Sequence, residues 1–314
     1  MNILVTGATG LIGSSLVNRL SIKFPHSTIY CTYNSNRSLL NRCEGSAKII
    51  MSPYSEIVNS KSIKFTQIWH FATYAQPSKF ILDWENTYTI NTLDIKKLLE
   101  ILEPNGKFIF ASSSEIYGSQ DNATEESMPS SYTCYDRSIY IDSKKIGESI
   151  LFKSLKKESF YIFRICLIYS DIFRPGDQRV LYDFVRKAIK YSEIKLLDDG
   201  RSMRQYLHIK DCINMMFSII DHHEKHTMVY PVPIFNISNP DPISILELAN
   251  LVAKNLNAKV IIPEKSKSIN PLSALSKVSV VPERFLNIFQ DYNFIELQSG
   301  IQDVCKNALK VNFE

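Results

Sequence analysis

Short apolar runs alternate with helical patterns through the first half of the chain. Apolar residues recur every three or four positions in three stretches, which predicts helices over 11–22, 84–102 and 137–156. Runs rich in β-branched and aromatic residues lie between these stretches and predict strands over 2–6, 28–33, 47–51, 67–72, 107–112 and 160–165. Strands that alternate with helices in this way form a parallel sheet with helices on both faces. The pattern therefore predicts a doubly wound α/β fold.

The alternation becomes less regular after residue 170. The pattern there predicts helices over 178–190, 211–221, 244–255 and 295–309, and strands over 194–197, 206–209 and 235–237. Ser244 and Glu247 have the spacing of a capping box at the start of one of these helices. We expect a larger domain over 1–170, to which 206–238 returns, and a smaller C-terminal domain over 171–205 and 239–314.

Composition narrows the class of protein. The chain is 45% hydrophobic and 22% charged, which is ordinary for a globular protein, and no apolar run is long enough to predict a transmembrane helix. The six cysteines are scattered without a Cys-x-x-Cys pair, so we expect reduced thiols, a cytoplasmic location and no metal site. The net charge of +4 suits a small anionic substrate, and the basic clusters lack the interleaved aromatic residues of a nucleic-acid surface.

Three glycines stand between the first predicted strand and the first predicted helix. Gly7 permits the tight turn, Gly10 lets the backbone approach a pyrophosphate, and Gly13 lets the helix pack on the sheet. The free N–H groups of the helix start then face the anion. The glycines and their neighbours Thr9, Leu11 and Ile12 are therefore the expected cofactor contacts of a Rossmann-type fold.

The residues after the second strand bear on which dinucleotide is bound. A fold that binds NAD usually carries an Asp or Glu here for the adenosine ribose, but residues 32–37 read Thr-Tyr-Asn-Ser-Asn-Arg. Arg37, with Ser35 or Asn34, is a candidate for holding the 2′-phosphate of NADP. The alternative is that Asn34 binds the ribose of NAD and Arg37 is exposed. NAD and NADP both stay open, with a slight preference for NADP.

A tyrosine and a lysine supply the candidate chemistry. Tyr140 and Lys144 are four residues apart and share one face of a predicted helix. A nearby ammonium favours the phenolate, so Lys144 is expected to lower the pKa of Tyr140. The pair is then able to take a proton from a substrate hydroxyl while a hydride leaves for a nicotinamide. Three serines, Ser112, Ser113 and Ser114, stand at the end of the fifth strand, where ligands sit in open α/β sheets, and a hydroxyl there can hydrogen-bond the reacting oxygen.

With these motifs the chain resembles the extended short-chain dehydrogenase/reductase family, in its nucleotide-sugar epimerase/dehydratase group. The resemblance rests on the Gly-rich turn, Trp69–Ala72, Asn91, the Ser-rich strand end, the Tyr140/Lys144 pair, Arg204–Asp211 and Leu297–Ile301. It implies that Ser113 is the catalytic hydroxyl, that Lys144 also holds the nicotinamide ribose, and that Phe71, Ala72 and Asn91 contact the cofactor. It also implies that the C-terminal domain is a substrate-binding cap and that the predicted helices 84–102 and 137–156 form a homodimer.

The residue at the position of Glu115 differs between enzymes of this group. Ser113-Ser-Glu115 resembles the Thr-Ser-Glu of UDP-glucuronate decarboxylases and GDP-mannose 4,6-dehydratases, whereas simple 4-epimerases tend to have small or neutral residues there. Stretches 75–80, 137–140 and 177–184 also resemble the decarboxylases. The resemblance implies substrate contacts from Gln76, Ser78, Ser114, Glu115, Arg137, Arg179 and Arg204, with Arg179 and Arg204 on the diphosphate.

The chain departs from the family pattern at three places. Leu167 replaces an Asn that often touches the substrate, Tyr169-Ser-Asp171 replaces Tyr-Gly-Pro, and Met51-Ser-Pro53 lacks an Asp that often contacts adenine. The expected activity is NAD(P)-dependent modification of a nucleotide-sugar through transient oxidation at sugar C4, ending in decarboxylation or 4,6-dehydration. A 4-epimerase or 4-keto reductase is the alternative, and a non-catalytic NAD(P)-binding regulatory protein is the remote one.

Overall fold

The computed structural model describes residues 1–34, 43–60, 62–129, 135–172, 177–227, 229–263 and 279–311. The chain divides into two compact units, each described here by itself. The first unit contains 1–116, 135–165 and 213–237, and the second contains 117–134, 166–212 and 238–314. The first unit thus ends earlier than the expected boundary at residue 170, and the segment that returns to it begins at 213 rather than 206.

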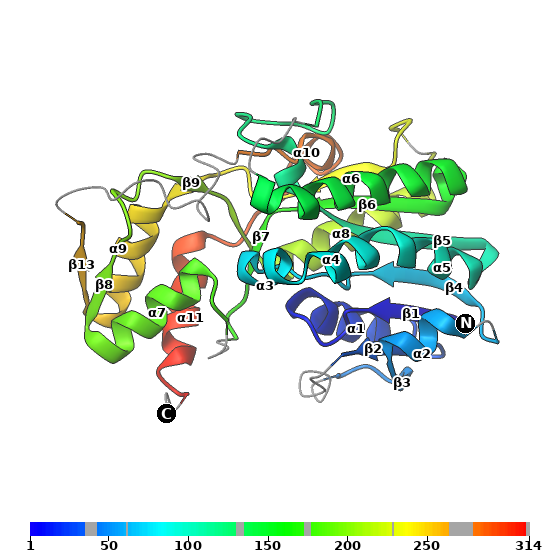
Figure 1. The fold of residues 1–314 in the computed structure, drawn as a ribbon, viewed down its shortest axis with the longest axis horizontal. Helices are drawn as coiled ribbons and strands as arrows, with labels where there is room; N and C mark the ends of the chain where they lie inside the picture. Colours follow the sequence, from blue (N-terminus) through cyan, green and yellow to red (C-terminus); the bar gives the residue numbers. More distant parts are fainter. Residues whose placement is uncertain are drawn as a thin grey trace. The chain divides into compact units, whose positions relative to one another are not determined.

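A seven-stranded sheet forms the centre of the first unit (Figure 1). The order is β11-β6-β5-β4-β1-β2-β3, and every neighbouring pair is parallel. The strands are β1 (Asn2–Thr6), β2 (Thr28–Tyr33), β3 (Lys48–Pro53), β4 (Phe65–His70), β5 (Leu102–Ser113), β6 (Phe160–Ile165) and β11 (Ile234–Ile237). The chain builds outward from β1 in one direction and then from β4 in the other, so the switch point of the sheet lies between these two strands. The predicted doubly wound fold is confirmed.

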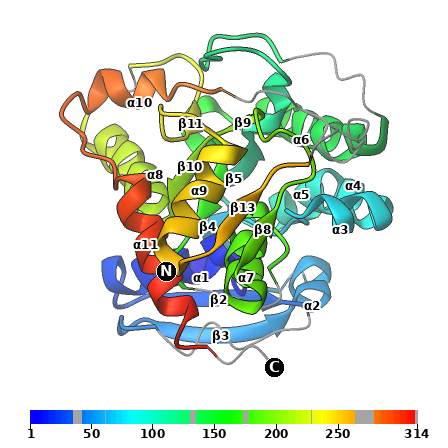
Figure 2. The ribbon, with the colours of Figure 1, turned by 90° about the vertical axis from the view of Figure 1, so that its left-hand side faces the viewer.

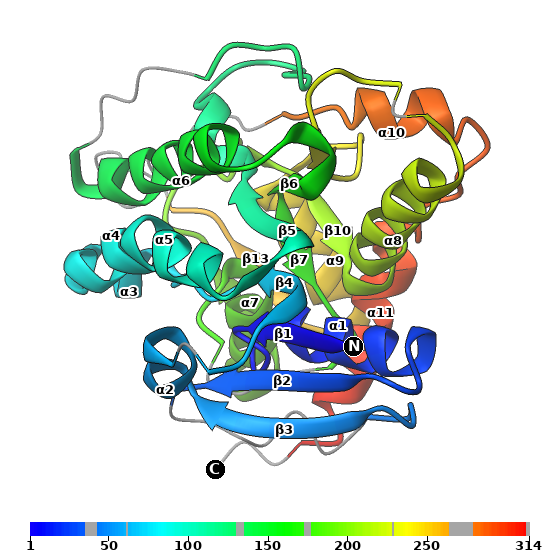
Figure 3. The same ribbon diagram turned by 90° about the vertical axis from the view of Figure 1, so that its right-hand side faces the viewer.

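Helices cover both faces of this sheet, as Figure 3 shows. One face carries α2 (Tyr54–Asn59), α4 (Trp84–Asn91), α5 (Leu93–Glu100) and α6 (Tyr135–Ser154), and the other carries α1 (Leu11–Lys23) and α8 (Ile209–Lys225). The core on the first of these faces is built from Leu4, Ile68, Ile95, Leu98, Phe108, Phe110, Leu151, Phe160 and Ile162, all of them fully buried. Burial of apolar side chains on both faces explains why the strands read as continuous apolar runs.

The single helix expected over 84–102 is wrong, because the chain forms two helices with a break at Thr92. The backbone of Thr92 leaves the helical region, with φ −133° and ψ −75°. Its hydroxyl donates a hydrogen bond of 2.6 Å to the carbonyl of Tyr88, which is the local bonding by which threonine competes with helix. The apolar periodicity continues across this break, so the hydrophobic pattern alone does not show it.

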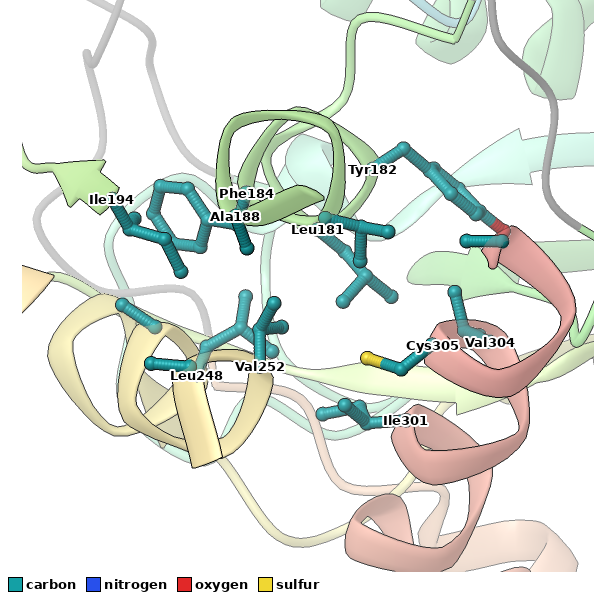
Figure 4. Close-up of a cluster of buried hydrophobic side chains, with 14 of the residues drawn as sticks. Leu181, Tyr182, Phe184, Ala188, Ile194, Leu248, Val252, Ile301, Val304 and Cys305 are labelled. Carbon is teal, nitrogen blue, oxygen red and sulfur yellow. The ribbon is translucent and has the colours of Figure 1, made fainter. Parts of the chain in front are cut away.

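Three helices and two strands supply most of the core of the second unit, and the buried Tyr169 and Tyr206 add to it (Figure 2). These elements are α7 (Val180–Tyr191), α9 (Ile245–Leu256), α11 (Leu297–Ala308), β8 (Glu193–Lys195) and β13 (Lys259–Ile261). Figure 4 shows their apolar side chains meeting, among them Leu181, Val252 and Ile301. The predicted capping box is confirmed, since the hydroxyl of Ser244 accepts from the Glu247 amide at 3.1 Å and the Glu247 carboxylate accepts in return.

Short elements complete the second unit. They are β7 (Leu167–Tyr169), β9 (Met203–Arg204), β10 (Tyr206–His208), β12 (Ile243–Ser244) and α10 (Glu283–Ile288). β7 pairs in parallel with β10, and β9 pairs antiparallel with β12. Within the described ranges, no helix is long and apolar enough to cross a bilayer.

Candidate active site

The glycine turn after β1 brings the backbone of three chain segments close together. Gly7 has φ +69°, and a Cβ atom on it would lie 2.7 Å from the backbone nitrogen of Ala72, which follows β4. A Cβ atom on Gly13 would overlap the carbonyl oxygen of Gly7, so no larger residue lets α1 start this close to the turn. Gly10 is exposed, and α1 begins directly after it. The turn therefore presents bare backbone and the N-terminus of a helix, which fits a pyrophosphate.

A buried hydrogen-bond chain fixes the ends of β1 and β4 beside this turn. The hydroxyl of Thr6 lies 2.8 Å from Nδ1 of His70, and Nε2 of His70 lies 2.9 Å from the carbonyl of Ile90. A carbonyl only accepts, so Nε2 carries the proton and Nδ1 accepts from Thr6. Burial and the nearby Lys144 lower the pKa of His70 to about 3, and the ring is neutral at ordinary pH. The same hydroxyl accepts from the amides of Phe71 and Ala72, both at 3.2 Å. His70 is thus a structural link, and it positions two expected cofactor contacts.

Ser113 ends β5, and the chain then turns into a short 3₁₀ helix over Ser114–Tyr117. The hydroxyl of Ser113 accepts from the amide of Glu115 at 3.2 Å and is hydrogen-bonded to Tyr140. Because β5, β4 and β1 are parallel neighbours, Ser113 lies at the same edge of the sheet as the glycine turn. Ser114 is buried beside it, with 4% of its surface exposed.

Tyr140 lies in an aromatic stack that the sequence did not predict. Its ring is parallel to that of Phe80 at 4.6 Å between centroids, and the guanidinium of Arg137 lies 5.3 Å from the same Phe80 ring. Phe80 comes from α3 (Pro77–Leu82), a helix of six residues that is too short to show a hydrophobic period. The stack therefore holds Tyr140 and Arg137 through a residue sixty positions away in the chain.

The pKa of Tyr140 moves in the direction opposite to the expected one. Burial raises it above its ordinary value, and the Glu115 carboxylate raises it further, while the Ser113 hydrogen bond and the Arg137 charge lower it in part. The expected net fall in the pKa of Tyr140 is therefore corrected: desolvation of a side chain that is 7% exposed outweighs the effect of neighbouring positive charge. Burial thus favours the neutral phenol form of Tyr140.

Lys144 is buried next to this phenol. Its ammonium donates a 2.6 Å hydrogen bond to the carbonyl of Ala111, and it lies 4.7 Å from the ring centroid of Phe110 and 6.0 Å from that of Tyr140. Only 1% of the residue is exposed. Burial lowers the pKa of Lys144 to about 7, although the carboxylate of Glu148 raises it. Near neutral pH the side chain is thus able to change charge, which few lysines are.

Glu115 forms an ion pair with Arg137 across this site. Nη2 of Arg137 lies 2.7 Å from each carboxylate oxygen of Glu115, and the two side chains are 9% and 21% exposed. A charge-assisted contact this well shielded holds the Glu115 carboxylate in one place. Ser113, Glu115, Arg137, Tyr140 and Lys144, all expected from the sequence to act at one site, therefore lie together.

The remaining expected contacts of the first unit are placed as follows. Asn91 is fully buried, and its amide donates a 3.0 Å hydrogen bond to Ser143 on α6, so it joins α4 to α6. Asn34 and Ser78 are exposed, and Gln76 is half-buried at the start of α3. Arg37 lies outside the described residues. The cofactor and substrate roles of these residues stay predictions.

Arg179 and Arg204 belong to the second unit. Arg179 is already paired, with its Nη2 2.6 Å and its Nε 3.0 Å from the Asp177 carboxylate, and its Nη1 2.5 Å from the carbonyl of Ile168. Arg204 donates to the carbonyl of Met203 at 2.7 Å. Their expected role as diphosphate ligands stays a prediction. The spacing of Asp177 and Arg179 in the sequence was the available signal for their ion pair.

A second buried charge cluster near Lys144 was also missed. Glu148 accepts from Nη2 of Arg164 at 2.7 Å and from the hydroxyl of Ser112 at 2.6 Å. The Glu148 and Arg164 side chains are 7% and 5% exposed. The available signals were an arginine inside the apolar strand β6 and a glutamate one helical turn after Lys144.

The fold and this site define a Rossmann-type α/β protein with a clustered Ser, Tyr and Lys. Residues 3–237 match the NAD dependent epimerase/dehydratase family, and the chain belongs to this family. Among curated proteins it is similar to UDP-glucuronic acid decarboxylase 1 of Danio rerio, with 23% identity over 256 residues. That alignment covers 80% of this chain and 59% of the relative, so this chain spans under two thirds of the relative's length.

Solved structures match nearly the whole chain. A UDP-glucose 4-epimerase of Thermotoga maritima, solved with UDP-glucose, matches at a TM-score of 0.76 and 19% identity. A UDP-glucuronic acid 4-epimerase of Bacillus cereus, solved with UDP-glucuronic acid and NAD, matches at 0.76 and 18%. Each alignment covers 99% of both chains. At this identity the likeness establishes the shared fold. The bare turn over Gly7–Gly13 fits the dinucleotide that the family uses.

Proposed function

We propose that this protein decarboxylates UDP-glucuronate, with NAD as its cofactor, through transient oxidation of the hydroxyl at sugar C4. The observation that carries the proposal is the cluster of Ser113, Tyr140, Lys144 and the Glu115–Arg137 pair at the carboxyl edge of β5. The similarity to a UDP-glucuronic acid decarboxylase supports this choice of reaction over the alternatives. The structural likeness to 4-epimerases supports 4-epimerisation as the second candidate.

Each residue of the cluster has its own role in the proposed reaction. A nicotinamide dinucleotide, when bound, would accept a hydride from the sugar and later return it. Oη of Tyr140, in its phenolate form, takes the proton of the C4 hydroxyl as general base, and the phenol so formed gives the proton back when the hydride returns. Oγ of Ser113, hydrogen-bonded to Tyr140, orients the reacting oxygen. The positive charge of Lys144 favours the phenolate form from which Tyr140 acts. Backbone N–H groups of the turn over Gly7–Gly13 hold the pyrophosphate.

The Glu115–Arg137 pair gives the site a carboxyl group of fixed position. A 4-ketone weakens the bond from C5 to a C6 carboxylate, and loss of carbon dioxide leaves C5 to be reprotonated. Glu115 is the group we assign to proton transfer at C5 or to positioning of the ring, and Arg137 holds it there. In this proposal Gln76, Ser78 and Ser114 contact the sugar, and the second unit is the substrate-binding cap, whose Arg179 and Arg204 hold the diphosphate.

NAD is the cofactor that the family description names, and the comparisons do not support the expected preference for NADP. That preference rests on Arg37 and on the missing acid after β2. We propose a cytoplasmic location, which the five cysteines free in the described residues support.

A panel of nucleotide sugars tests the proposed activity. The purified full chain is incubated with UDP-glucuronate, UDP-glucose and GDP-mannose, each with NAD or with NADP, and products are weighed by mass spectrometry. We expect UDP-glucuronate to lose the mass of carbon dioxide with NAD. Loss of water from a neutral sugar would point to a dehydratase. A product of unchanged mass but new retention time would point to a 4-epimerase, and either result would refute decarboxylation.

We also propose a homodimer through α4, α5 and α6. Trp84, Leu93 and Ile146 are 51%, 46% and 40% exposed on these helices, which pack on one another, so apolar surface is available there for an interface. We expect light scattering to give the mass of two chains for the unaltered protein and of one chain for Trp84→Lys. The variant would bury a lysine charge without a counter-charge in the interface, which disfavours association. Leu197→Lys, at a 71% exposed residue of the second unit, is the matched control and should stay dimeric. A single-chain mass for the unaltered protein would exclude this dimer.

A further inference from the structure

We infer that the buried Glu148–Arg164 pair positions Lys144. The pair holds the Lys144 side chain in register with β5 and keeps its ammonium group protonated. The inference rests on the proposed function, in which Lys144 needs its positive charge. Glu148 and Arg164 contact each other, Glu148 also accepts from Ser112, and Glu148 lies one helical turn from Lys144. Their effect on the reaction would therefore pass through Lys144.

The contacts that position Lys144 join two successive residues of β5 to two successive turns of α6. The carbonyl of Ala111 accepts from Lys144 at 2.6 Å, and the hydroxyl of the next residue, Ser112, donates to Glu148 at 2.6 Å. Lys144 and Glu148 are four residues apart, so both side chains leave the same face of α6 toward β5. A shift of α6 along the strand would break both contacts together.

Arg164 fixes this arrangement from the neighbouring strand. Its Nη2 and Nε donate to the two oxygens of Glu148 at 2.7 Å and 3.1 Å, and Ser112 and Arg164 are direct partners in the β5–β6 register. A two-pronged contact of a planar guanidinium with a carboxylate fixes direction as well as distance. Glu148 is therefore tied to two strands while it lies one turn from Lys144.

The charges around Lys144 show what this placement does. Tyr140 and Glu148 face it from α6, neutral His70 from β4, and the Phe110 ring and Ala111 carbonyl from β5, with Arg164 behind Glu148 on β6. Glu148 is the one anionic group among them. Burial lowers the pKa of Lys144 to about 7, and the Glu148 carboxylate opposes that effect. Without this carboxylate Lys144 would lose its proton below neutral pH.

The test measures the titration of Lys144 directly and needs no substrate. The full chain is labelled with ¹³C at the lysine ε-carbon, and the Lys144 signal is identified as the one missing from Lys144→Arg. In the unaltered protein we expect a midpoint near 7, far below the ordinary lysine value of about 10.4. Glu148→Gln keeps the shape and removes the charge, and should lower the midpoint by about 1 pH unit.

Two further variants separate this role from support of the fold. Glu148→Gln leaves Arg164 buried without its counter-charge and is expected to lower the melting temperature. Glu148→Gln with Arg164→Met removes both charges, so the melting temperature should recover while the Lys144 midpoint stays low. Asp142→Asn removes an exposed carboxylate from the same helix and should leave the midpoint unchanged.

The outcomes decide the inference independently of the proposed function. An unchanged Lys144 midpoint in both the single and the double variant would show that the pair only supports the fold. An equal shift in Asp142→Asn would show a general charge effect, and would also overturn the inference. Failure of every nucleotide sugar to react would reject the proposed function but leave the titration result intact.

Discussion

Tyr140→Phe is expected to abolish turnover while the protein remains folded and binds its cofactor. The change removes only the phenol oxygen, which is the atom that handles the proton in the proposed reaction. The ring would keep its stack on Phe80 at 4.6 Å, and the one lost hydrogen bond, to Ser113, is worth about 1 kcal/mol of stability. Loss of general base catalysis lowers rates by about 10²–10⁴-fold.

Tyr161→Phe is the matched control for this prediction. Tyr161 is a buried tyrosine of the same unit, stacked on Phe163 in β6, and it lies at the opposite end of the strand from the catalytic cluster. Both variants lose one buried phenol oxygen, and only Tyr140→Phe should lose activity. Rates are followed by product mass, and cofactor binding by nicotinamide fluorescence. Near-normal turnover by Tyr140→Phe would remove Tyr140 from the mechanism.

The fold was predictable to the extent that it depends on local pattern. Strands β1, β2 and β6 coincide with the predicted ranges, because each is a short apolar run bounded by polar or turn residues. The glycine turn was predictable for a similar reason, since the spacing of Gly7, Gly10 and Gly13 encodes one backbone shape. The break at Thr92 was not, because a side chain bonding to its own helix leaves the hydrophobic period intact.

The residues of the site could be predicted from the sequence, but the directions of their pKa shifts could not. Spacing along one helix was enough to bring Tyr140 and Lys144 together. The end of a strand marked three serines, and the family resemblance selected Ser113 among them. The direction of the pKa shift of Tyr140 depends on how deeply it is buried, and that depends on Phe80 from a helix too short to predict. The Glu148–Arg164 pair likewise joins a helix and a strand that no local pattern relates.

Glu115→Gln is expected to separate the first chemical step from the later ones. The Glu115 carboxylate raises the pKa of Tyr140, and Arg137 lowers it. Removing the negative charge leaves the Arg137 charge less balanced, so the pKa of Tyr140 should fall and oxidation of the sugar should persist at lower pH than in the unaltered protein. A glutamine, however, cannot remove or return a proton at C5. Final product should therefore fall by about 10²–10⁴-fold, the range of general acid–base catalysis.

Arg137→Gln is the partner variant, because it changes the same ion pair with the opposite sign. Loss of the guanidinium leaves the Glu115 carboxylate unopposed beside Tyr140, so oxidation should slow and require higher pH. Single-turnover absorbance at the reduced-nicotinamide band reports the first step in both variants, and product mass reports the last. If Glu115→Gln forms product at the normal rate, Glu115 has no proton-transfer role, and the 4-epimerase becomes the better assignment. If both variants slow oxidation equally, the ion pair only holds the structure of the site, and its charges do not set the pKa of Tyr140.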